Sequence, residues 1–212
     1  MKNLIQCFKL SVCVLITTFG MAACNSGNTN TETTSDSTMT TSDSTMTSGT
    51  NNTQDTAKQQ HAVAVLSGVT ADTTVTGNVE FDAQADGKVK MKLELNIPKK
   101  ANSSVAVHIH EMGDCGSMGD MGKAAGGHWN PTNAKHGKWG SSSFHLGDIG
   151  NVKLDAKGMG TMEMETDLWT IGGDAKSDIL GKSIIVHGGV DDYTSQPSGG
   201  AGSRMACGTI TM

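Results

Sequence analysis

The chain has 212 residues and a formal net charge of −5, a length that suits one ordinary domain or two small ones. An acidic chain without a basic run argues against nucleic acid as a partner. The apolar run at residues 10–21 is too short for a membrane-spanning helix, which needs about 20 apolar residues.

Residues 1–23 have the features of a secretory signal peptide. Lys2 and Lys9 precede the apolar run, and the small residues Ala22 and Ala23 follow it. The sequence Met-Ala-Ala-Cys resembles the lipobox of bacterial lipoproteins, in which Cys24 would become the acylated N-terminus. The alternative is a plain secreted protein cleaved near Ala23. We expect a lipoprotein anchored in the bacterial cell envelope, facing the periplasm or lying on the outer-membrane surface.

Residues 24–60 follow as a polar segment rich in Ser, Thr, Asn, Asp, Gly and Gln, in which residues 33–39 repeat directly as residues 40–46. Such a composition cannot bury enough apolar surface to offset the entropy lost on ordering, so we predict a disordered linker. As a coil, the 36 residues from 25 to 60 would span roughly 30–36 Å. The segment therefore suits a spacer between a lipid anchor and a folded domain.

From residue 61 to residue 212 the sequence consists of short alternating segments separated by turns. The clearest is 89–97, where Val89, Met91 and Leu93 alternate with Lys90 and Lys92, which predicts one face in the core and one in water. We expect no convincing helix and about eight strands, at residues 62–66, 74–81, 89–97, 105–110, 150–154, 160–165, 183–187 and 205–211. This pattern predicts an all-β domain, an eight-stranded antiparallel Greek-key sandwich or flattened barrel with long loops.

Histidines dominate the middle of this domain. In the segment 105–110, His108 and His110 alternate with apolar residues, so both imidazoles point to one face, a geometry that suits a metal ion. A lone His-x-His is more often two exposed polar residues. Here the glycine-rich loop 111–149 follows, and so long a loop in a compact domain is usually functional. Further candidates for metal ligands follow at His128, His136, His145, Asp148 and His187.

This series, together with the motifs Gly-Asp-Cys at 113–115 and Gly-Gly-His-Trp-Asn-Pro at 126–131, resembles the copper,zinc superoxide dismutase family over about residues 61–212. The resemblance implies one copper per subunit, held by His108, His110, His128 and His187. It also implies one zinc per subunit, held by His128, His136, His145 and Asp148. The imidazolate of His128 would then bridge the two metals. Three histidines and an aspartate suit a structural zinc, and imidazoles suit copper in either oxidation state.

Two further side chains receive a role from the same resemblance. Asp191 would accept hydrogen bonds from His108 and His136, which fixes the orientation of metal-ligating imidazoles; an ordinary turn aspartate is the alternative. Arg204 would position an anionic substrate beside copper with its fork of donors; a surface salt bridge is the alternative.

The cysteines support an oxidising compartment. Once the signal peptide and Cys24 are set aside, Cys115 and Cys207 remain, and two thiols in such a compartment predict one disulfide. The family pairs cysteines at these two motif positions, so the resemblance implies the same bond. It would join the start of the histidine-bearing loop to the last strand.

The function that the resemblance implies is disproportionation of superoxide to dioxygen and hydrogen peroxide, protecting the cell envelope from oxidative damage. Arg204 and His128 would be the catalytic residues. One departure from the animal and plant members is the short segment between His187 and Arg204, which contains no lysine or arginine. Bacterial members differ in their loops and dimer surfaces, so a homodimer stays an open alternative.

The charge of the mature chain raises a question about its anionic substrate. Loss of residues 1–23 removes two lysines and no acid, which leaves 14 basic and 21 acidic side chains and a net charge of −7. A local field governs approach more than net charge does. We therefore expect Arg204 to attract superoxide, helped by Lys123, Lys135 and Lys138.

Two other classes of function are compatible with the sequence. A non-enzymatic copper- or zinc-binding lipoprotein on the same scaffold would typically lack one or more ligands, and none is missing here. A structural or adhesive surface module would need neither a bridging histidine nor Arg204.

Overall fold

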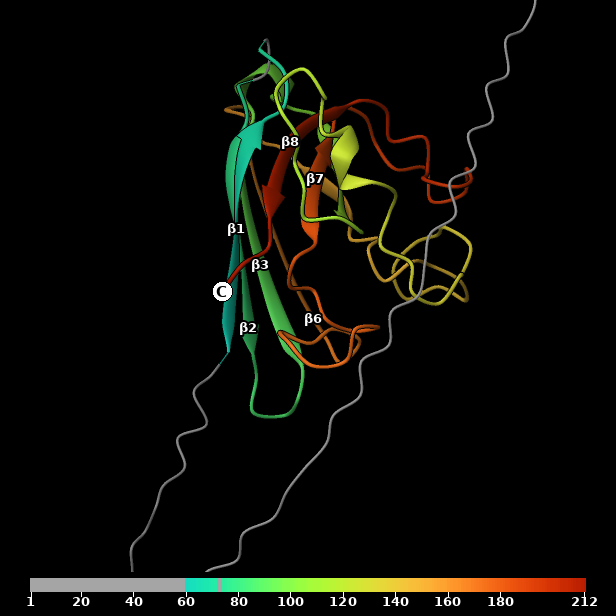
Figure 1. Ribbon diagram of the computed structural model, residues 1–212. Coiled ribbons are helices and arrows are strands. Elements are labelled where there is room, and N and C mark those ends of the chain that lie inside the picture. Colours follow the sequence, from blue (N-terminus) through green and yellow to red (C-terminus); the bar gives the residue numbers. More distant parts are fainter. Residues whose placement is uncertain (1–59, 72–73) are drawn as a thin grey trace, which may run out of the picture. The chain divides into compact units, whose positions relative to one another are not determined.

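The computed structural model describes residues 60–71 and 74–212, so the predicted signal peptide, Cys24 and the linker up to residue 59 lie outside the described residues. The described part contains two single-turn 3₁₀ helices, no α-helix and eight strands (Figure 1). The strands are β1 (His61–Gly68), β2 (Thr76–Ala83), β3 (Val89–Asn96), β4 (Ser104–His110), β5 (Gly150–Lys153), β6 (Met159–Thr166), β7 (Ser183–His187) and β8 (Arg204–Thr209). No helix in these ranges is long and apolar enough to cross a membrane.

All eight strands form one antiparallel sheet in the order β5-β4-β7-β8-β1-β2-β3-β6. The end strands β5 and β6 contact one another, so the sheet curls into a nearly closed barrel. Because β3 pairs with β6 and β4 pairs with β7, the chain crosses between the two halves of the barrel, as in a Greek key. The predicted all-β antiparallel fold is confirmed.

The predicted strands differ from the observed ones mainly at their ends. The second strand was expected at residues 74–81, but pairing with β1 starts at Ser67 opposite Thr76, so β2 begins later and runs to Ala83. The last strand was expected to reach residue 211. It ends at Thr209, and Thr211 makes only an isolated bridge with Val63.

The strand β3 shows how alternation builds the barrel. Its residues Val89, Met91, Leu93 and Leu95 are buried, while the residues between them are exposed. On the outer face, Lys88 pairs with Glu165 of β6 at 2.8 Å, one of several ion pairs on this surface. Such exposed pairs contribute little to stability, about 0–1 kcal/mol each, so the apolar face determines the fold.

The strands β4 and β7 differ from β3 because both of their faces are buried. Val105, Val107 and Ile109 belong to the main core, whereas His108 and His110 on the opposite face of β4 are also inaccessible. Two loops, 111–149 and 188–203, gather beside these strands in Figure 1 (yellow-green and red). The barrel thus presents its histidine-bearing face to a layer of loops.

Candidate metal centre

The seven predicted ligands come from three parts of the chain and converge into two groups. In each group, ligand atoms from all the residues lie within 4.8 Å of one another, and every residue is buried. The first group is His108, His110, His128 and His187, and the second is His128, His136, His145 and Asp148. Among the described residues only His128 belongs to both groups. This is the arrangement that a bridging imidazole requires.

The sheet fixes the first group. His108 and His110 project from β4, and a bulge between Val186 and His187 changes the register with β8, which places His187 opposite Arg204. Bulges commonly re-aim a side chain at the edge of a functional site. His128 joins β4 through an isolated bridge with His110, so the loop ligand is aligned by backbone pairing.

Gly147 docks the loop ligands of the second group onto β4. Its N–H donates to the carbonyl of Trp129, and its carbonyl accepts from the N–H of Ile109, both at 2.9–3.0 Å. A Cβ at this position would overlap the carbonyl oxygen of Ile109, so only glycine permits this approach. His145 and Asp148, on either side of Gly147, are thereby held against the sheet.

Buried ring nitrogens without hydrogen-bond partners mark where an ion would lie. His108 Nδ1, His128 Nε2, His136 Nδ1 and His145 Nδ1 are buried and make no hydrogen bond, although the last two lie close to the Asp148 carboxylate. Unpaired buried polar atoms are costly and rare, so each needs an explanation. His110 Nε2 and His187 Nε2 lie 3.4 Å apart and face each other in the same cluster. Lone pairs converging on a common point are what a metal ion needs, so the residues present fit copper and zinc.

The opposite nitrogen of several rings is held by an outer partner, which fixes the tautomer. Asp191 accepts from His108 Nε2 at 2.8 Å through one oxygen and from His136 Nε2 at 2.9 Å through the other. His110 Nδ1 donates to the carbonyl of Gly126 at 3.0 Å. With these protons placed outward, the remaining nitrogens are free to ligate. Asp191 thus connects one residue of each group, as the resemblance implies.

Asp148 lies at the centre of the second group. Its carboxylate oxygens are 2.9 Å from His128 Nδ1, 3.0 Å from His136 Nδ1 and 3.2 Å from His145 Nδ1. Backbone N–H groups of Gly137 and His145 donate to the same carboxylate. Burial alone would raise the pKa of Asp148, but the contacts with the His128 and His145 imidazoles, together with the two backbone hydrogen bonds, outweigh it and hold the pKa far below its usual range. The carboxylate is therefore charged, the form that binds zinc.

Burial keeps three histidines of the first group neutral. Burial, assisted by the neighbouring imidazoles, lowers the pKa of His128 to about 4 and that of His187 to about 3. The pKa of His110 is lowered for the same two reasons. At neutral pH these rings are uncharged and carry one N–H each, which leaves the lone pair of the other nitrogen available for a metal.

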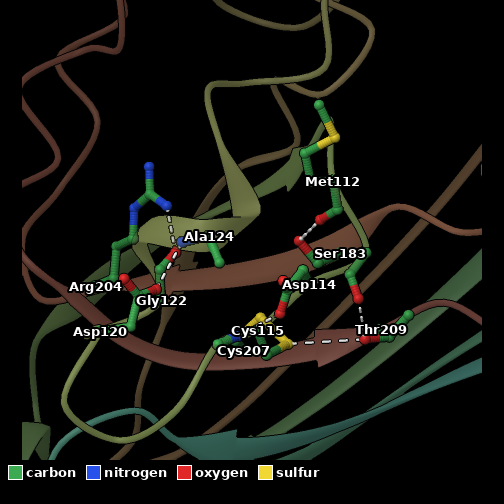
Figure 2. Close-up of a disulfide and its surroundings, with 12 residues drawn as sticks. Met112, Asp114, Cys115, Asp120, Gly122, Ala124, Ser183, Arg204, Cys207 and Thr209 are labelled. Carbon is green, nitrogen blue, oxygen red and sulfur yellow. Dashed lines mark hydrogen bonds between the residues drawn. A yellow bond between two sulfur atoms is a disulfide. The ribbon is translucent and has the colours of Figure 1, made fainter.

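A cavity of about 530 Å³ opens over the first group. Its wall includes His110, His128, His187, Lys135 and Arg204. The guanidinium of Arg204 donates to the carbonyls of Gly122 and Gly126 (Figure 2 draws the first of these bonds). The cavity thus places a fixed positive charge beside three of the four histidines of the first group.

The three lysines that were expected to assist Arg204 occupy different positions. Lys135 lines the cavity itself. Lys123 lines a neighbouring pocket of about 330 Å³ that shares Arg204 with it. Lys138 lines neither pocket. Lys135 is therefore the one of these three lysines that lines the cavity, a difference that the sequence alone could not reveal.

The loop that carries Gly122 and Gly126 is tied to the sheet at its start. Cys115 and Cys207 form the expected disulfide. Beside it, Ser183 Oγ donates to the carbonyl of Met112 at 2.7 Å and Thr209 Oγ1 donates to that of Gly113 at 2.6 Å (Figure 2). Neither hydroxyl was singled out from the sequence, because a serine or threonine in a strand carries no local signal for such a contact.

Asn151 was also missed. Its side chain accepts from the N–H of Asp191 at 2.8 Å and donates to the carbonyl of Asp191 at 2.9 Å. It donates to the hydroxyl of Tyr193 as well, at 3.0 Å. The amide of Asn151 thus fixes the backbone of the residue that connects the two ligand groups, across 40 positions of sequence.

Comparison with known proteins places this geometry in a family. Residues 75–210 match the family model described as copper/zinc superoxide dismutase. "Superoxide dismutase [Cu-Zn] 1" of Aquifex aeolicus is 38% identical over 131 residues, which cover 60% of this chain and 75% of that protein. "Superoxide dismutase [Cu-Zn]" of Yarrowia lipolytica is 36% identical over 160 residues, covering 70% and 96%. Among solved structures, "clock protein EA4" matches with a TM-score of 0.61 and 31% identity, covering 72% of this chain and 94% of that one.

Proposed function

The chain belongs to the copper/zinc superoxide dismutase family, and we propose that it removes superoxide in a bacterial cell envelope, held to a membrane by a lipid on Cys24. As a superoxide dismutase it converts two superoxide anions and two protons into dioxygen and hydrogen peroxide. The observation that carries the site assignment is that His128 takes part in both ligand groups. A redox metal and a structural metal can then share one imidazole.

We assign copper to His108, His110, His128 and His187, and zinc to His128, His136, His145 and Asp148. The assignment is supported by the chemistry of the donors. The zinc group contains a charged carboxylate and three nitrogens, a closed set typical of structural zinc. The copper group contains imidazoles alone and borders an open cavity, so a small substrate can reach it.

The metals and the protein residues contribute different parts of the reaction. Copper, when bound, supplies the one-electron chemistry, while zinc has no redox chemistry and holds the ligand geometry. His128 Nε2, which has no partner within the protein, is suited to hold a proton and release it to the reduced substrate. Arg204 uses donors on the Gly122 and Gly126 carbonyls, and its remaining N–H groups can hold a diatomic anion at the cavity wall.

Arg204→Ala is expected to lower the dismutation rate about tenfold or more, equivalent to a loss of roughly 1.4 kcal/mol of transition-state stabilisation. The reason is the loss of the positive charge that faces the cavity. The measurement is the catalytic rate against ionic strength, with copper content checked in parallel. Full activity of Arg204→Ala with copper in place would refute the anion-positioning role.

Glutamine substitutions of the three lysines provide graded controls for this experiment. Lys135→Gln and Lys123→Gln should each cause a smaller loss and weaken the salt dependence, because exposed charges are screened over about 8 Å at physiological ionic strength. Lys138→Gln should have the least effect, since Lys138 lines neither pocket.

Cys24→Ser is expected to block lipid attachment and signal-peptide processing, so the precursor should accumulate. Wild-type protein should partition with membranes after cell fractionation and carry an acylated N-terminus detectable by mass spectrometry. Cys13→Ser is the matched control, because Cys13 lies within the predicted signal peptide and should be dispensable. Soluble wild-type protein with an unmodified N-terminus would rule out the lipid anchor.

A further inference from the structure

The side chain of Gln196 makes a paired contact with a residue of the zinc group. Its Oε1 accepts from the backbone N–H of His136 at 2.9 Å, and its Nε2 donates to the backbone carbonyl of His136, also at 2.9 Å. The same Nε2 donates to the carbonyl of Thr194 at 3.2 Å, which orients the amide from its own loop. One amide thus pairs with both backbone groups of His136, as a neighbouring strand would.

His136 needs such a partner because its loop lacks regular structure. No strand lies between His110 and Gly150 in the described chain, so no sheet ladder fixes the backbone of His136. Its imidazole nevertheless makes two contacts that require a fixed position. Nδ1 lies 3.0 Å from Asp148, and Nε2 donates to Asp191 at 2.9 Å. A ligand constellation must be held within about 0.5 Å, which an unsupported loop does not provide.

The loop that carries Gln196 is itself anchored. Asn151, on β5, fixes the backbone of Asp191 through the same kind of paired amide contact. Asp192 then holds the following turn by accepting from the N–H groups of Thr194 and Ser195, both at 2.8 Å. Asn151 on the sheet therefore fixes the loop 188–203 at Asp191. The same loop fixes the backbone of His136 through Gln196.

Gly199 brings the same loop directly over the connection between the two metal groups. A Cβ at this position would overlap Asp191 Oδ1 and His136 Nε2, and the φ of Gly199 is +67°. Gly199 is buried, so the loop covers the hydrogen bond between His136 and Asp191. The segment between His187 and Arg204, which contains no lysine or arginine, therefore packs against residues of the metal site.

We propose that Gln196 is a positioning residue for zinc, which fixes the backbone of His136 and so holds Nδ1 of that ring at the metal position. The inference rests on the proposed zinc assignment and extends it to a residue outside the ligand set. Loss of partners that orient metal ligands typically lowers affinity 10- to 100-fold. Because Gln196 acts on the backbone and is exposed, we expect the lower end of that range.

The test uses protein purified free of metal and titrated with zinc in competition with a chelating dye. Gln196→Met keeps the length of the side chain and removes both hydrogen bonds to His136 together with the one to Thr194, so zinc should bind about tenfold more weakly. Gln196→Glu keeps the acceptor for the N–H of His136 but turns a charged oxygen toward the carbonyls of His136 and Thr194, so it should also weaken zinc binding. Gln84→Met is the matched control, since Gln84 makes one comparable amide contact, to the carbonyl of Asp82, outside both ligand groups.

A second readout separates positioning from general stability. With cobalt(II) in place of zinc, the visible absorption bands report ligand geometry, and Gln196→Met should shift them whereas Gln84→Met should not. Zinc affinity of Gln196→Met within twofold of wild type, or unchanged cobalt bands, would overturn the inference. If wild-type protein binds no zinc, both the zinc assignment and the inference are wrong. If wild type binds zinc and Gln196→Met shows the loss, but the copper-loaded enzyme is inactive, only the proposed function fails.

Discussion

Replacing His187 by alanine is expected to lower the dismutation rate by at least about a thousandfold, a loss of roughly 4 kcal/mol of transition-state stabilisation. His187 belongs only to the copper group, and its Nε2 lies 3.4 Å from that of His110. Removing it opens the copper group and leaves the zinc group complete. The variant should therefore lose tightly bound copper and retain zinc.

The measurement combines metal content by mass spectrometry with a superoxide-dismutation assay. His61→Ala is the matched control, because His61 is the one histidine outside both groups and pairs at the surface with Asp82 at 2.8 Å. That variant should keep both metals and full activity. Retained activity in His187→Ala, or loss of zinc together with copper, would show that the two groups are assigned incorrectly.

The second large effect concerns stability. Replacing Cys115 and Cys207 by serine should lower the free energy of unfolding by about 4–5 kcal/mol in the chain-entropy model, since the disulfide closes a loop with a sequence separation of 92. The metal-free protein is the right sample, because bound metal would add its own stabilisation. Urea denaturation followed by circular dichroism measures the difference.

Ser183→Ala provides the comparison for this experiment. It removes one hydrogen bond that docks the same loop and should cost only about 1 kcal/mol. A loss below this value in the double cysteine variant would mean that the loop is held by its hydrogen bonds rather than by the disulfide. The disulfide variant should also lose activity, because the loop supplies the carbonyls that hold Arg204.

The sequence predicted most of the fold because the barrel depends on a local pattern. Alternation such as that in β3 identifies a strand without reference to its neighbours, and a short apolar run such as that in β7 identifies another. Eight short segments separated by turns are enough to predict an antiparallel barrel. The ends of strands were less predictable, since they depend on where a partner begins. Thr76 starts β2 because it lies opposite Ser67, which no local pattern reveals.

The ligands themselves could be predicted because they stand in motifs that resemble those of the copper,zinc superoxide dismutase family. Asp191 could be predicted in the same way, but the residues that fix the backbone of the site could not. Asn151 and Gln196 are common polar residues whose partners lie 40 and 60 positions away. Their function comes from the loop geometry that brings them to Asp191 and His136. Only the folded structure shows that two amides hold the backbone of the metal site.

The ranking of Lys123, Lys135 and Lys138 depended on structure for a related reason. All three lie in the same loop and have the same charge, so sequence gives them equal weight. The path of the loop decides that Lys135 faces the cavity and Lys138 does not. Which lysine borders the cavity is thus a property of loop conformation rather than of net charge.

The most direct test is to measure the copper and zinc content of the purified protein together with its rate of superoxide dismutation. We predict one copper and one zinc per chain, with activity that disappears when copper is removed and returns when copper, but not zinc alone, is restored. A protein that holds both metals in the two groups and shows no dismutation above background would contradict the proposed function and favour a metal-binding role on the same scaffold.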